Sequence, residues 1–462
     1  MDLMEKVVQL AKARGFVFPG SDIYGGLANS WDYGPLGAQL KNNIRDAWWK
    51  YFVTSRTDMV GLDSAILMNP RVWESSGHTA NFNDAQVDCK NCKKRLRADH
   101  LIEDNIKDAK VEGLSMEDLT KLIVDNKIAC PNCGARDFTE ARRFNLLFKT
   151  SIGKLEDARE AVYLRGELAQ GMFVDFPQIV KAVRPRLPFG IAQIGKVFRN
   201  EITPGNFTFR TLEFDLMEFE YFIRPETWEQ TFEYWMKEMK EFAAFVGVDM
   251  SRVRQREHTQ DELSHYSKRT ADLEFQTPFG WKEMFGCAYR TDFDLRNHAE
   301  QSGKELRYTD PVTNEKFFPH VVEPTFGLTR LMLMIMLSAY TEEQVGTAKE
   351  GETETRVVMK FPRHIAPIQV AVLPLSKKEE LAKPARELQA TLAKKFITTY
   401  DETQSIGKRY RRQDEIGTPF CITVDFDTLN DQAVTVRDRD TMQQERIKIA
   451  ELPAYLSAKF SL

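Results

Sequence analysis

Val197-Phe198-Arg199-Asn200-Glu201 is the stretch from which the fold of this chain is predicted, and it places an arginine between an apolar pair and an acid. A second arginine ends Phe326-Gly327-Leu328-Thr329-Arg330, which opens the apolar segment 331–337. A single arginine at such a position usually belongs to a surface or structural ion pair. The two stretches become stronger evidence for a phosphate-binding site when the motifs present in and missing from the rest of the chain are considered.

Common nucleotide-binding and hydrolytic motifs are missing from the sequence. There is no G-x-x-x-x-G-K-[ST] phosphate loop and no G-x-G-x-x-G dinucleotide turn. A G-x-S-x-G nucleophile elbow and an H-E-x-x-H metal motif are also missing. Any phosphate binding must therefore depend on arginines and a metal ion. Arginine suits this task because its guanidinium group is always charged and binds phosphate through two hydrogen bonds.

Size and composition predict a globular protein of two or three domains. The chain has 462 residues, of which 42% are hydrophobic and 29% charged, and domains usually run about 100–200 residues. The net charge of -4 provides no overall basic field, so RNA binding would need local patches such as Lys408-Arg409-Tyr410-Arg411-Arg412. No apolar run reaches the roughly 20 residues of a membrane-spanning helix, and the charged N-terminus is unlike a signal peptide. We expect a cytoplasmic protein.

Hydrophobic periodicity predicts both helices and strands. An apolar residue at every fourth position predicts an amphipathic helix over 36–52. Its tandem tryptophans, Trp48 and Trp49, indicate either a core helix or a subunit interface. The C-terminal part restarts the pattern and predicts a small α/β domain. Further predicted strands lie at 214–222, 368–373, 420–426 and 433–437, further helices at 227–246 and 377–396, and a polar surface excursion at 342–354.

Four of the six cysteines form two C-x-x-C pairs, Cys89-Lys90-Asn91-Cys92 and Cys130-Pro131-Asn132-Cys133. In a chain of this size without a signal peptide, this pattern favours a metal over disulfides. Four thiolates make a closed tetrahedral zinc site, which is structural rather than catalytic. Reduced thiols without metal are the alternative. The long gap between the pairs predicts a helical excursion over 99–127, and Cys287 and Cys421 are expected to be buried bystanders.

Several stretches resemble the signature motifs of class II aminoacyl-tRNA synthetases. Phe198-Arg199-Asn200-Glu201, the loop through Phe209-Arg210 and the strand from Glu213 are similar to the second motif. Gly327-Leu328-Thr329-Arg330 is similar to the third, and the segment around Pro35 stands where the first, dimer-forming motif belongs. The resemblance narrows to the bacterial homodimeric glycyl-tRNA synthetases and covers essentially the whole chain. Longer similar strings are Trp31-Asp32-Tyr33-Gly34-Pro35-Leu36-Gly37, Arg71-Val72-Trp73-Glu74-Ser75-Ser76-Gly77-His78, Arg97-Ala98-Asp99-His100-Leu101-Ile102-Glu103, Phe189-Gly190-Ile191-Ala192-Gln193-Ile194-Gly195-Lys196 and Pro319-His320-Val321-Val322-Glu323-Pro324.

The resemblance implies an α+β fold with a class II catalytic domain, in which an antiparallel sheet is flanked by helices, an inserted zinc-knuckle region, and a C-terminal α/β anticodon-binding domain. We predict the N-terminal part of the catalytic domain, with a dimerisation helix, at 1–86, the Cys-bearing insertion at 87–160, the catalytic core at 161–362 and the anticodon-binding domain at 363–462. The implied activity is that of a glycine–tRNA ligase. It forms glycyl-adenylate and pyrophosphate from glycine and ATP with Mg²⁺, then transfers glycine to the 3′ end of tRNA-Gly.

Adenylate formation needs no general base, because the attacking carboxylate is already ionised. Catalysis therefore reduces to positioning and to charge stabilisation at phosphorus. By resemblance, Arg199 holds the α-phosphate and the amino-acid carboxylate, Arg330 the γ-phosphate, and Glu201 assists through Mg²⁺; these three form the predicted catalytic set. The implied ATP-binding residues are Arg199, Asn200, Glu201, Phe209, Arg210, Phe214, Glu283, Met284, Gly327 and Arg330.

The amino-acid pocket implied by the resemblance is acidic, because glycine offers an ammonium group, a carboxylate and no side chain. Its residues are Arg97, Glu167, Phe214, Glu218, Glu323 and Thr325. Filling the space beyond the α-carbon rejects larger amino acids sterically, whereas a loose pocket gains only about 1–3 kcal/mol of discrimination per methylene.

The chain departs from the family pattern around this pocket. Pro and Thr are usual near the first glutamate, where this chain reads Leu164-Arg165-Gly166-Glu167-Leu168. Leu212 stands where arginine is common, Leu216 where glutamine is common, and Thr325 where serine is usual. We hypothesise that the extra methyl group of Thr325 tightens the pocket around the α-carbon.

Other functional classes stay open at this point. A catalytically impaired relative could serve as a nucleic-acid-binding accessory protein, but such proteins lack phosphate arginines like Arg199 and Arg330. An adenylate-forming enzyme that serves a carrier protein would have no anticodon domain, and a zinc-stapled scaffold would leave the arginine and glutamate motifs unexplained. The synthetase interpretation is favoured. It predicts tRNA-Gly, glycine and ATP as partners, a homodimeric protein, and no association with a membrane.

Overall fold

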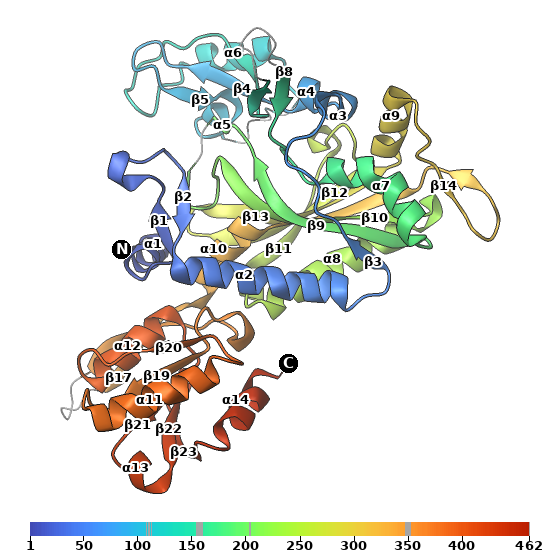
Figure 1. Ribbon diagram of the computed structural model, residues 1–462. Coiled ribbons are helices and arrows are strands. Elements are labelled where there is room, and N and C mark those ends of the chain that lie inside the picture. The colour runs from blue at the N-terminus through green and yellow to red at the C-terminus, as the bar shows by residue number, and fades with distance from the viewer. Residues whose placement is uncertain are drawn as a thin grey trace.

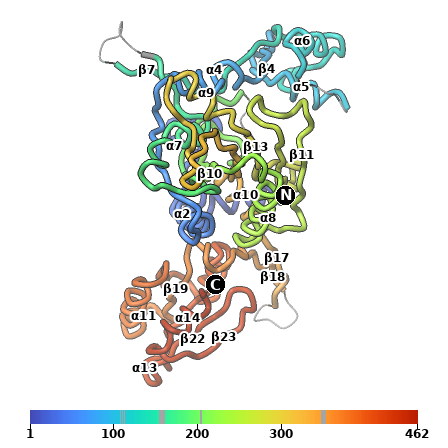
Figure 2. The backbone as a smooth tube through the Cα atoms, turned by 90° about the vertical axis from the view of Figure 1, so that its right-hand side faces the viewer, coloured from blue at the N-terminus to red at the C-terminus, as the bar shows by residue number. Residues whose placement is uncertain are grey.

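The computed structural model describes residues 1–107, 109, 111, 113–153, 160–202, 205–346 and 353–461. Figures 1 and 2 show a central sheet domain, with the Cys-bearing insertion at one end and the C-terminal domain at the other. The central sheet has seven strands, and only the pairing of β3 with β9 is parallel. In order these strands are β11 (Val253–Glu257), β12 (Arg269–Thr277), β13 (Gly280–Thr291), β16 (His320–Gly327), β10 (Glu213–Ile223), β9 (Phe189–Phe198) and β3 (Met59–Gly61).

One face of this sheet packs on the largest apolar core. Alternate side chains of β10, namely Met217, Phe219 and Tyr221, point to this face. The helices that cover it are α1 (Leu3–Ala13), α2 (Pro35–Trp49), α8 (Trp228–Phe245) and α10 (Leu328–Ala339). Proline at the first turn starts α2, and a π-helical turn over Lys50–Thr54 extends it. The helices predicted over 36–52, 227–246 and 331–337 are confirmed, but Trp48 is buried in the core and is therefore not an exposed interface residue.

The opposite face of β10 carries the polar site. Leu216, Glu218, Glu220 and Phe222 point to this face, because they alternate with the core residues along the strand. Phe222 packs with Phe173 and Phe176 of α7 into a second apolar cluster. The helices on this side are α3 (Pro70–Ser75), α4 (His78–Asn81), α7 (Ala169–Val183) and α9 (Phe293–Ser302). Carboxylates on β10 are thus enclosed between the sheet and helices from distant parts of the chain.

The Cys-bearing insertion has its own small core. Its three-stranded sheet has the order β5-β4-β6, and the helices α5 and α6 pack beside it. Both helices fall within the predicted excursion over 99–127, apart from the start of α5, and β4 begins before the predicted boundary at 87. The bounds are β4 (Asn83–Asp88), β5 (Arg95–Arg97), α5 (Ala98–Glu103), α6 (Met116–Asp125) and β6 (Arg142–Asn145).

The C-terminal domain is the predicted α/β unit. Its five-stranded sheet runs β20-β19-β21-β22-β23, with β19 parallel to both neighbours. A hairpin, β17 (Tyr340–Gly346) and β18 (Thr353–Met359), leads into it, while residues 347–352 of the predicted excursion lie outside the described residues. The bounds are β19 (Val370–Pro374), α11 (Glu379–Leu392), β20 (Thr398–Tyr400), α12 (Ile406–Ile416), β21 (Phe420–Val424), α13 (Thr428–Asp431), β22 (Ala433–Asp438), β23 (Gln444–Lys448) and α14 (Leu452–Phe460).

Three further two-stranded pairs lie outside these sheets in the described chain. The pairs are β1 (Val17–Pro19) with β2 (Trp31–Tyr33), β7 (Lys149–Ile152) with β8 (Glu160–Tyr163), and β14 (Tyr308–Thr309) with β15 (Lys316–Phe317). Among the described residues, no helix is both long and apolar enough to cross a bilayer.

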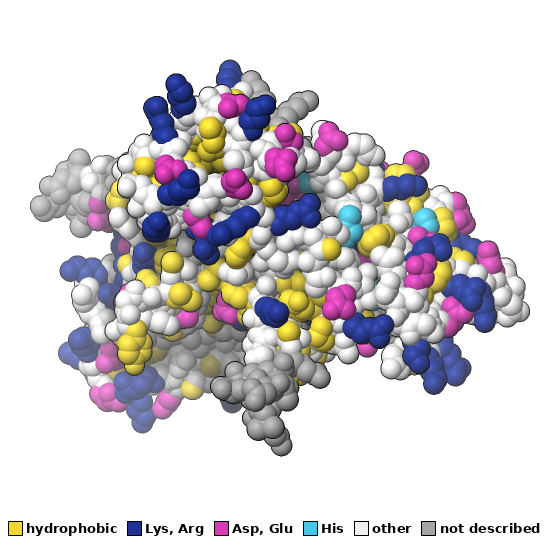
Figure 3. Space-filling view, turned by 90° about the horizontal axis from the view of Figure 1, so that it is seen from above, with side chains coloured by type: hydrophobic (Ala, Val, Ile, Leu, Met, Phe, Trp, Pro, Cys, Tyr) yellow, Lys and Arg dark blue, Asp and Glu magenta, His cyan; other side chains and the backbone are white. Residues whose placement is uncertain are grey.

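The predicted basic patch on α12 is largely neutralised or turned inward. Arg409 is buried and donates to the backbone oxygen of Pro374, and the Tyr410 hydroxyl bonds to Thr423. Arg411 pairs with Glu354 and Arg412 with Asp401. The prediction that this stretch forms an exposed patch is therefore wrong for Arg409 and Tyr410. Over the end of the molecule seen in Figure 3, Lys and Arg side chains are likewise interspersed with Asp and Glu.

Candidate active site

Two arginines predicted from the sequence face one hollow at the end of the central sheet. Its lining residues are Arg199, Glu201, Phe209, Arg210, Thr211, Phe214, Leu216, Glu283, Met284, Thr325, Gly327, Thr329 and Arg330. Every predicted ATP-binding residue except Asn200 belongs to this set. The residues come from β10, β13, β16, α10 and the loops beside them, including the loop that follows β9. The fold therefore brings together residues from separate stretches of sequence.

Arg199 follows the end of β9 and is held from both sides. Its guanidinium carbon lies 5.2 Å from the ring centre of Phe82 and 5.4 Å from that of Phe214. Its Nε donates to the backbone oxygen of Gly166 at 3.2 Å. Its two Nη groups make no hydrogen bond among the described residues. A guanidinium group fixed in this way is pre-organised to donate to an anion.

Arg330, on the first turn of α10, is paired with a carboxylate. Its Nη1 lies 2.8 Å from Glu283 Oε2, and its guanidinium carbon lies 4.7 Å from the Phe209 ring centre. Arg330 lowers the pKa of Glu283, which is therefore ionised at neutral pH. On the other side of the hollow, Arg210 lies 4.0 Å from Glu201. The hollow thus offers cations for phosphate and carboxylates for a divalent metal.

A cluster of buried carboxylates lies next to this hollow. Glu218, Glu220 and Glu323 place one oxygen each within 4.8 Å of one another. Glu218 lies across from Thr325 in the pairing of β10 with β16. Thr325 Oγ1 donates to Glu218 Oε1 at 3.1 Å, and the backbone nitrogen of Leu168 donates to Glu218 Oε2. Thr325 also lines the arginine hollow, so the acidic cluster and the hollow are continuous.

Arg290 of β13 is the cation at the centre of the carboxylates. It is fully buried and donates to Asp294, one helical turn on, through Nε and Nη2 at 2.8 and 3.0 Å. Its Nη1 donates to Glu323 at 2.9 Å, and Nη2 lies 3.6 Å from Glu167. The Tyr266 ring centre lies 3.8 Å from the guanidinium carbon. Such a buried network requires every partner, since removal of one leaves an uncompensated charge.

Glu167 is fixed by a second set of contacts. His78 Nε2 lies 3.2 Å from one carboxylate oxygen, and Gln170 Nε2 donates to the other at 2.8 Å. Burial opposes ionisation, but His78 and Arg290 more than offset it and hold the pKa of Glu167 below its usual value. Glu167 therefore carries a negative charge at neutral pH. A hydrogen bond between Ser76 Oγ and His78 Nδ1, 2.8 Å long, orients the histidine ring.

The four cysteines of the insertion converge as predicted. The Sγ atoms of Cys89 and Cys133 are 3.6 Å apart, and those of Cys92 and Cys130 are 3.7 Å apart. A zinc ion about 2.3 Å from four sulfurs at tetrahedral corners holds them roughly 3.8 Å from one another. Lys93 and Gly134, each one residue after a C-x-x-C pair, both have a left-handed backbone conformation. The two knuckles therefore have the same turn and a spacing that fits zinc.

Three family models match the chain. They are the tRNA synthetase class II core domain (G, H, P, S and T) at residues 148–339, the glycyl-tRNA synthetase insertion domain 1 at 110–146 and the anticodon binding domain at 369–459. The glycine–tRNA ligase of Geobacillus thermodenitrificans is 55% identical over 462 residues, covering 99% of this chain and 98% of that protein. The glycine–tRNA ligases of Caldanaerobacter subterraneus and Bacillus anthracis are 54% and 53% identical, with the same 99% of this chain covered and 98% and 99% of theirs.

The chain belongs to the glycine–tRNA ligase family. The sequence-based assignments of class II ligase chemistry, of an α+β synthetase core and of a C-terminal anticodon-binding α/β domain are confirmed. The matched insertion domain contains one cysteine pair and residues 110–127 of the predicted excursion before it.

One residue expected in the amino-acid pocket of this glycine–tRNA ligase family member lies elsewhere. Arg97 is at the end of β5 in the insertion, paired with Asp84 at 3.0 Å and with Asp99. It lines a second hollow with His100, Arg210 and other residues. The structure therefore groups Arg97 with Phe209 and Arg210 of the arginine hollow and does not bring it among the carboxylates around Arg290.

The departures from the family pattern act largely through the backbone. The oxygen of Gly166 accepts from Arg199, and that of Leu212 accepts from the Arg199 nitrogen. The Leu168 nitrogen binds Glu218. A Cβ on Gly166 would lie 3.1 Å from side-chain atoms of Leu147 and Phe82, so glycine keeps room for the ring that packs on Arg199. Leu216 contributes an apolar wall to the arginine hollow.

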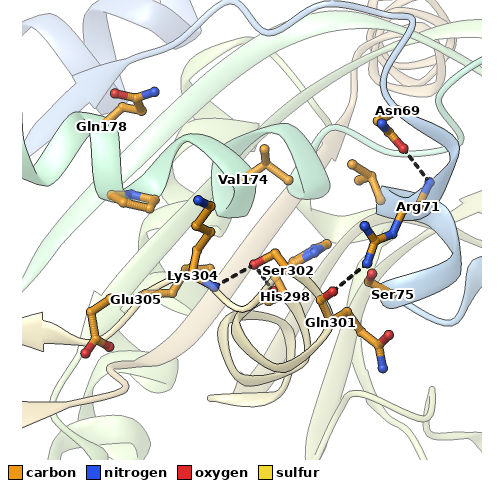
Figure 4. Close-up of a pocket in the computed structure, with 13 residues that line it drawn as sticks. Asn69, Arg71, Ser75, Val174, Gln178, His298, Gln301, Ser302, Lys304 and Glu305 are labelled. Atoms are coloured by element: carbon orange, nitrogen blue, oxygen red, sulfur yellow. Dashed lines mark hydrogen bonds between the residues drawn. The ribbon is translucent and has the colours of Figure 1, made fainter.

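A further hollow opens behind the carboxylates, between α3, α7 and α9 (Figure 4). His298 lies at its inner end, and its Nε2 and Gln170 Oε1 are 2.7 Å apart. Gln170 in turn donates to Glu167 and to Asp294. Burial lowers the pKa of His298, which is therefore neutral at neutral pH. This hollow belongs to the support of the acidic pocket and shares no lining residue with the arginine hollow.

Sequence reasoning missed the residues that hold the pocket glutamates in place. These are His78, Gln170, Arg290, Asp294 and His298, and it also missed Glu220, which is buried beside them. Polar residues inside otherwise apolar elements, such as Glu220 between Phe219 and Tyr221, were the available signal. That signal indicates a buried polar site but not which residues meet there.

Proposed function

We propose that this chain activates glycine with ATP and transfers it to the 3′ end of tRNA-Gly, and that Arg199, Glu201 and Arg330 carry the first step. The observation that carries the proposal is the position of Thr325, which lines the arginine hollow and donates to Glu218 of the carboxylate cluster. A phosphate site and an ammonium site therefore meet at one residue. Glycine bound there would present its carboxylate to the arginines.

The first step follows from this arrangement. Glu167, Glu218 and Glu323 bind the ammonium group, and the glycine carboxylate faces Arg199. A carboxylate oxygen attacks the α-phosphorus, the bond to the β-phosphate oxygen breaks, and pyrophosphate leaves. Arg199 and Arg330 stabilise the charge that develops on the phosphate oxygens, and no protein base is required. Mg²⁺ bound by ATP would be held through Glu201 and Glu283 and would neutralise the leaving pyrophosphate.

In the second step, a ribose hydroxyl at the 3′ end of the tRNA attacks the glycyl carbonyl and AMP leaves. The C-terminal domain, matched by the anticodon-binding model, would hold the other end of the same tRNA. The test is ATP–pyrophosphate exchange with glycine, alanine and serine, followed by charging of total tRNA. Glycine-selective exchange and charging are expected. Exchange without a preference for glycine would contradict the assignment of glycine as the substrate. No exchange at all in folded protein would favour a nucleic-acid-binding accessory role.

We propose that the four cysteines hold a structural Zn²⁺. Support comes from the two sulfur–sulfur separations and the matching turns. Cys89 and Cys130 are buried in the small apolar core of the insertion, so a metal that joins the two cysteine pairs would add to the stability of that core. Zinc content of purified protein, measured by elemental analysis, should be close to one per chain and should fall on Cys130→Ser. Equal zinc content in the two proteins would contradict the proposal.

We also propose a homodimer in the cytoplasm. The solvent-facing side of α2, with Asn43 and Asp46 beside Tyr51 and Phe245, forms a hollowed surface suited to a partner helix. The unpaired thiols suit a reducing compartment. Light scattering should give twice the chain mass, and fractionation should recover the protein with the cytosol. A monomeric mass would contradict the homodimer, and recovery with membranes would contradict the cytoplasmic location.

A further inference from the structure

Glu220 is fully buried in the carboxylate cluster, and its carboxyl group has no hydrogen-bonding partner in the part of the chain that the structure describes. The strand register pairs Glu218 with Thr325 and Tyr221 with Val322, so Glu220 lies across from Glu323. Neither carboxyl oxygen of Glu220 has a partner among the described residues. One oxygen of Glu220 lies within 4.8 Å of those of both Glu218 and Glu323. Buried polar groups in folded proteins are almost always satisfied, so this exception needs an explanation.

The charges around Glu220 make its ionised form costly. Among the described residues, the charged groups that face it are Glu218 on its own strand, Glu323 on β16, Asp294 on α9, Glu167 before α7 and the cation Arg290 on β13. Arg290 is already bonded to Asp294 and Glu323. Burial, and then Glu218, Asp294 and Glu167, raise the pKa of Glu220 well above its usual value although Arg290 opposes them. Burial, Glu220 and Glu218 raise the pKa of Glu323 as well, so the two neighbouring carboxyl groups hold a proton between them. Arg290 donates to Glu323 at 2.9 Å, whereas no donor among the described residues reaches Glu220, which places that proton on Glu220. Adjacent carboxylates in such a site share a proton.

We propose that Glu220 is a positioning residue of the amino-acid pocket, which keeps its proton at neutral pH and donates it to Glu323, a carboxylate that binds the ammonium group of glycine. This inference rests on the proposed function of the pocket. The donated hydrogen bond turns the free lone pairs of Glu323 toward the ammonium group. The proton also removes one negative charge from the cluster, which reduces the repulsion among the buried carboxylates.

The first experiment compares Glu220→Gln with Glu220→Met in glycine-dependent ATP–pyrophosphate exchange. Both side chains are neutral and similar in size, but only glutamine can donate to Glu323. We expect the KM for glycine to stay within about threefold for Glu220→Gln and to rise about tenfold or more for Glu220→Met, with the KM for ATP unchanged in both, because a hydrogen bond to a charged acceptor is lost in Glu220→Met alone. Equal glycine KM values in the two variants would overturn the proposal.

The second experiment needs no activity and separates the proton from a purely structural role. Because folding raises the pKa of Glu220, the wild-type protein loses stability relative to Glu220→Gln as pH rises above the ordinary glutamate pKa of about 4.3. The Tm of Glu220→Gln minus that of the wild type should therefore increase from about pH 5 to about pH 8. A difference that is constant or shrinks with pH would show that Glu220 is ionised and would overturn the proposal. If the wild-type protein shows no glycine-dependent exchange, the proposed function is contradicted. The pH dependence of the Tm difference can still be interpreted in that case, because it does not require activity.

Discussion

Thr325 donates its hydroxyl hydrogen bond to Glu218 across the pairing of β16 with β10, at 3.1 Å. The contact joins the two halves of the proposed site, because Thr325 also faces the arginine hollow. Serine could make the same hydrogen bond. The difference is one methyl group, which occupies space at the junction where the α-carbon of glycine would lie.

Thr325→Ser should therefore raise alanine-dependent ATP–pyrophosphate exchange while glycine-dependent exchange changes little. One methyl group in a pocket wall contributes about 1–3 kcal/mol to the discrimination between glycine and alanine. Because neighbouring side chains can partly relax, we expect alanine-dependent exchange to increase roughly tenfold. Thr211→Ser is the matched control, since Thr211 lines the same hollow but bonds to the backbone oxygen of Glu213. Lower alanine activation in Thr325→Ser would refute the steric hypothesis.

Replacement of Arg290 should destabilise the whole domain. Arg290→Gln leaves Asp294, Glu323 and Glu167 without their shared cation in a buried site. The expected loss is about 3–5 kcal/mol in the free energy of unfolding, measured by urea denaturation. Arg254→Gln removes a solvent-exposed arginine paired with Glu274 on neighbouring strands and should cost less than about 1 kcal/mol. If the two variants lose similar amounts of unfolding free energy, the buried network around Arg290 does not stabilise the domain more than an exposed ion pair does.

Arg330→Gln should impair ATP use more than glycine use. Arg330 faces the hollow beside Glu283, and its hydrogen bonds among the described residues go to Phe209 and Glu283 rather than to the carboxylates around Arg290. Loss of a charge-assisted contact to phosphate should lower kcat/KM for ATP about tenfold to a hundredfold, with the KM for glycine within about threefold. Initial rates of exchange at varied ATP and glycine provide both values. Arg254→Gln again serves as the control, and an equal rise in both KM values would contradict the assignment.

The pH dependence of stability should change when Glu167 is neutralised. His78 and Arg290 hold the pKa of Glu167 below its usual value despite burial. The stability from its ionised form is therefore fully present above the ordinary glutamate pKa of about 4.3 and is lost as pH falls through the lower folded-state pKa. Glu167→Gln should be less stable than the wild type near neutral pH, and the gap should narrow in acid. Thermal melts over a pH series test this, and a gap that widens in acid would refute it.

Local sequence strings were sufficient to predict the fold, and they named candidate site residues that the structure brings together in one hollow. The helix over 36–52 and the strand over 214–222 have an apolar periodicity that tertiary contacts reinforce rather than oppose. Arg199 and Arg330 each stand at the junction of a strand or helix with a turn, where a short motif specifies both the element and the side chain's direction.

The support of the pocket could not be predicted in the same way. Glu220, Arg290 and Asp294 lie on different elements, and their roles depend on which strands become neighbours. Arg409 looked like part of an RNA-binding patch, but the packing of α12 against the C-terminal sheet buries it. The charge of a side chain in a sequence says nothing of its burial, because a long side chain can turn inward when the backbone offers acceptors.

The sequence by itself predicted the order of the domains, two arginines for phosphate, glutamates for an acidic pocket and four cysteines for a metal, because each lies within a contiguous motif whose local conformation depends on near neighbours. Tertiary structure alone decided that Arg290 would face three carboxylates, that Thr325 would join the two halves of the site, and that Glu220 would lie buried without a partner. The physical reason is that burial and strand register convert distant charges into neighbours, and the energy of a charge depends on what surrounds it.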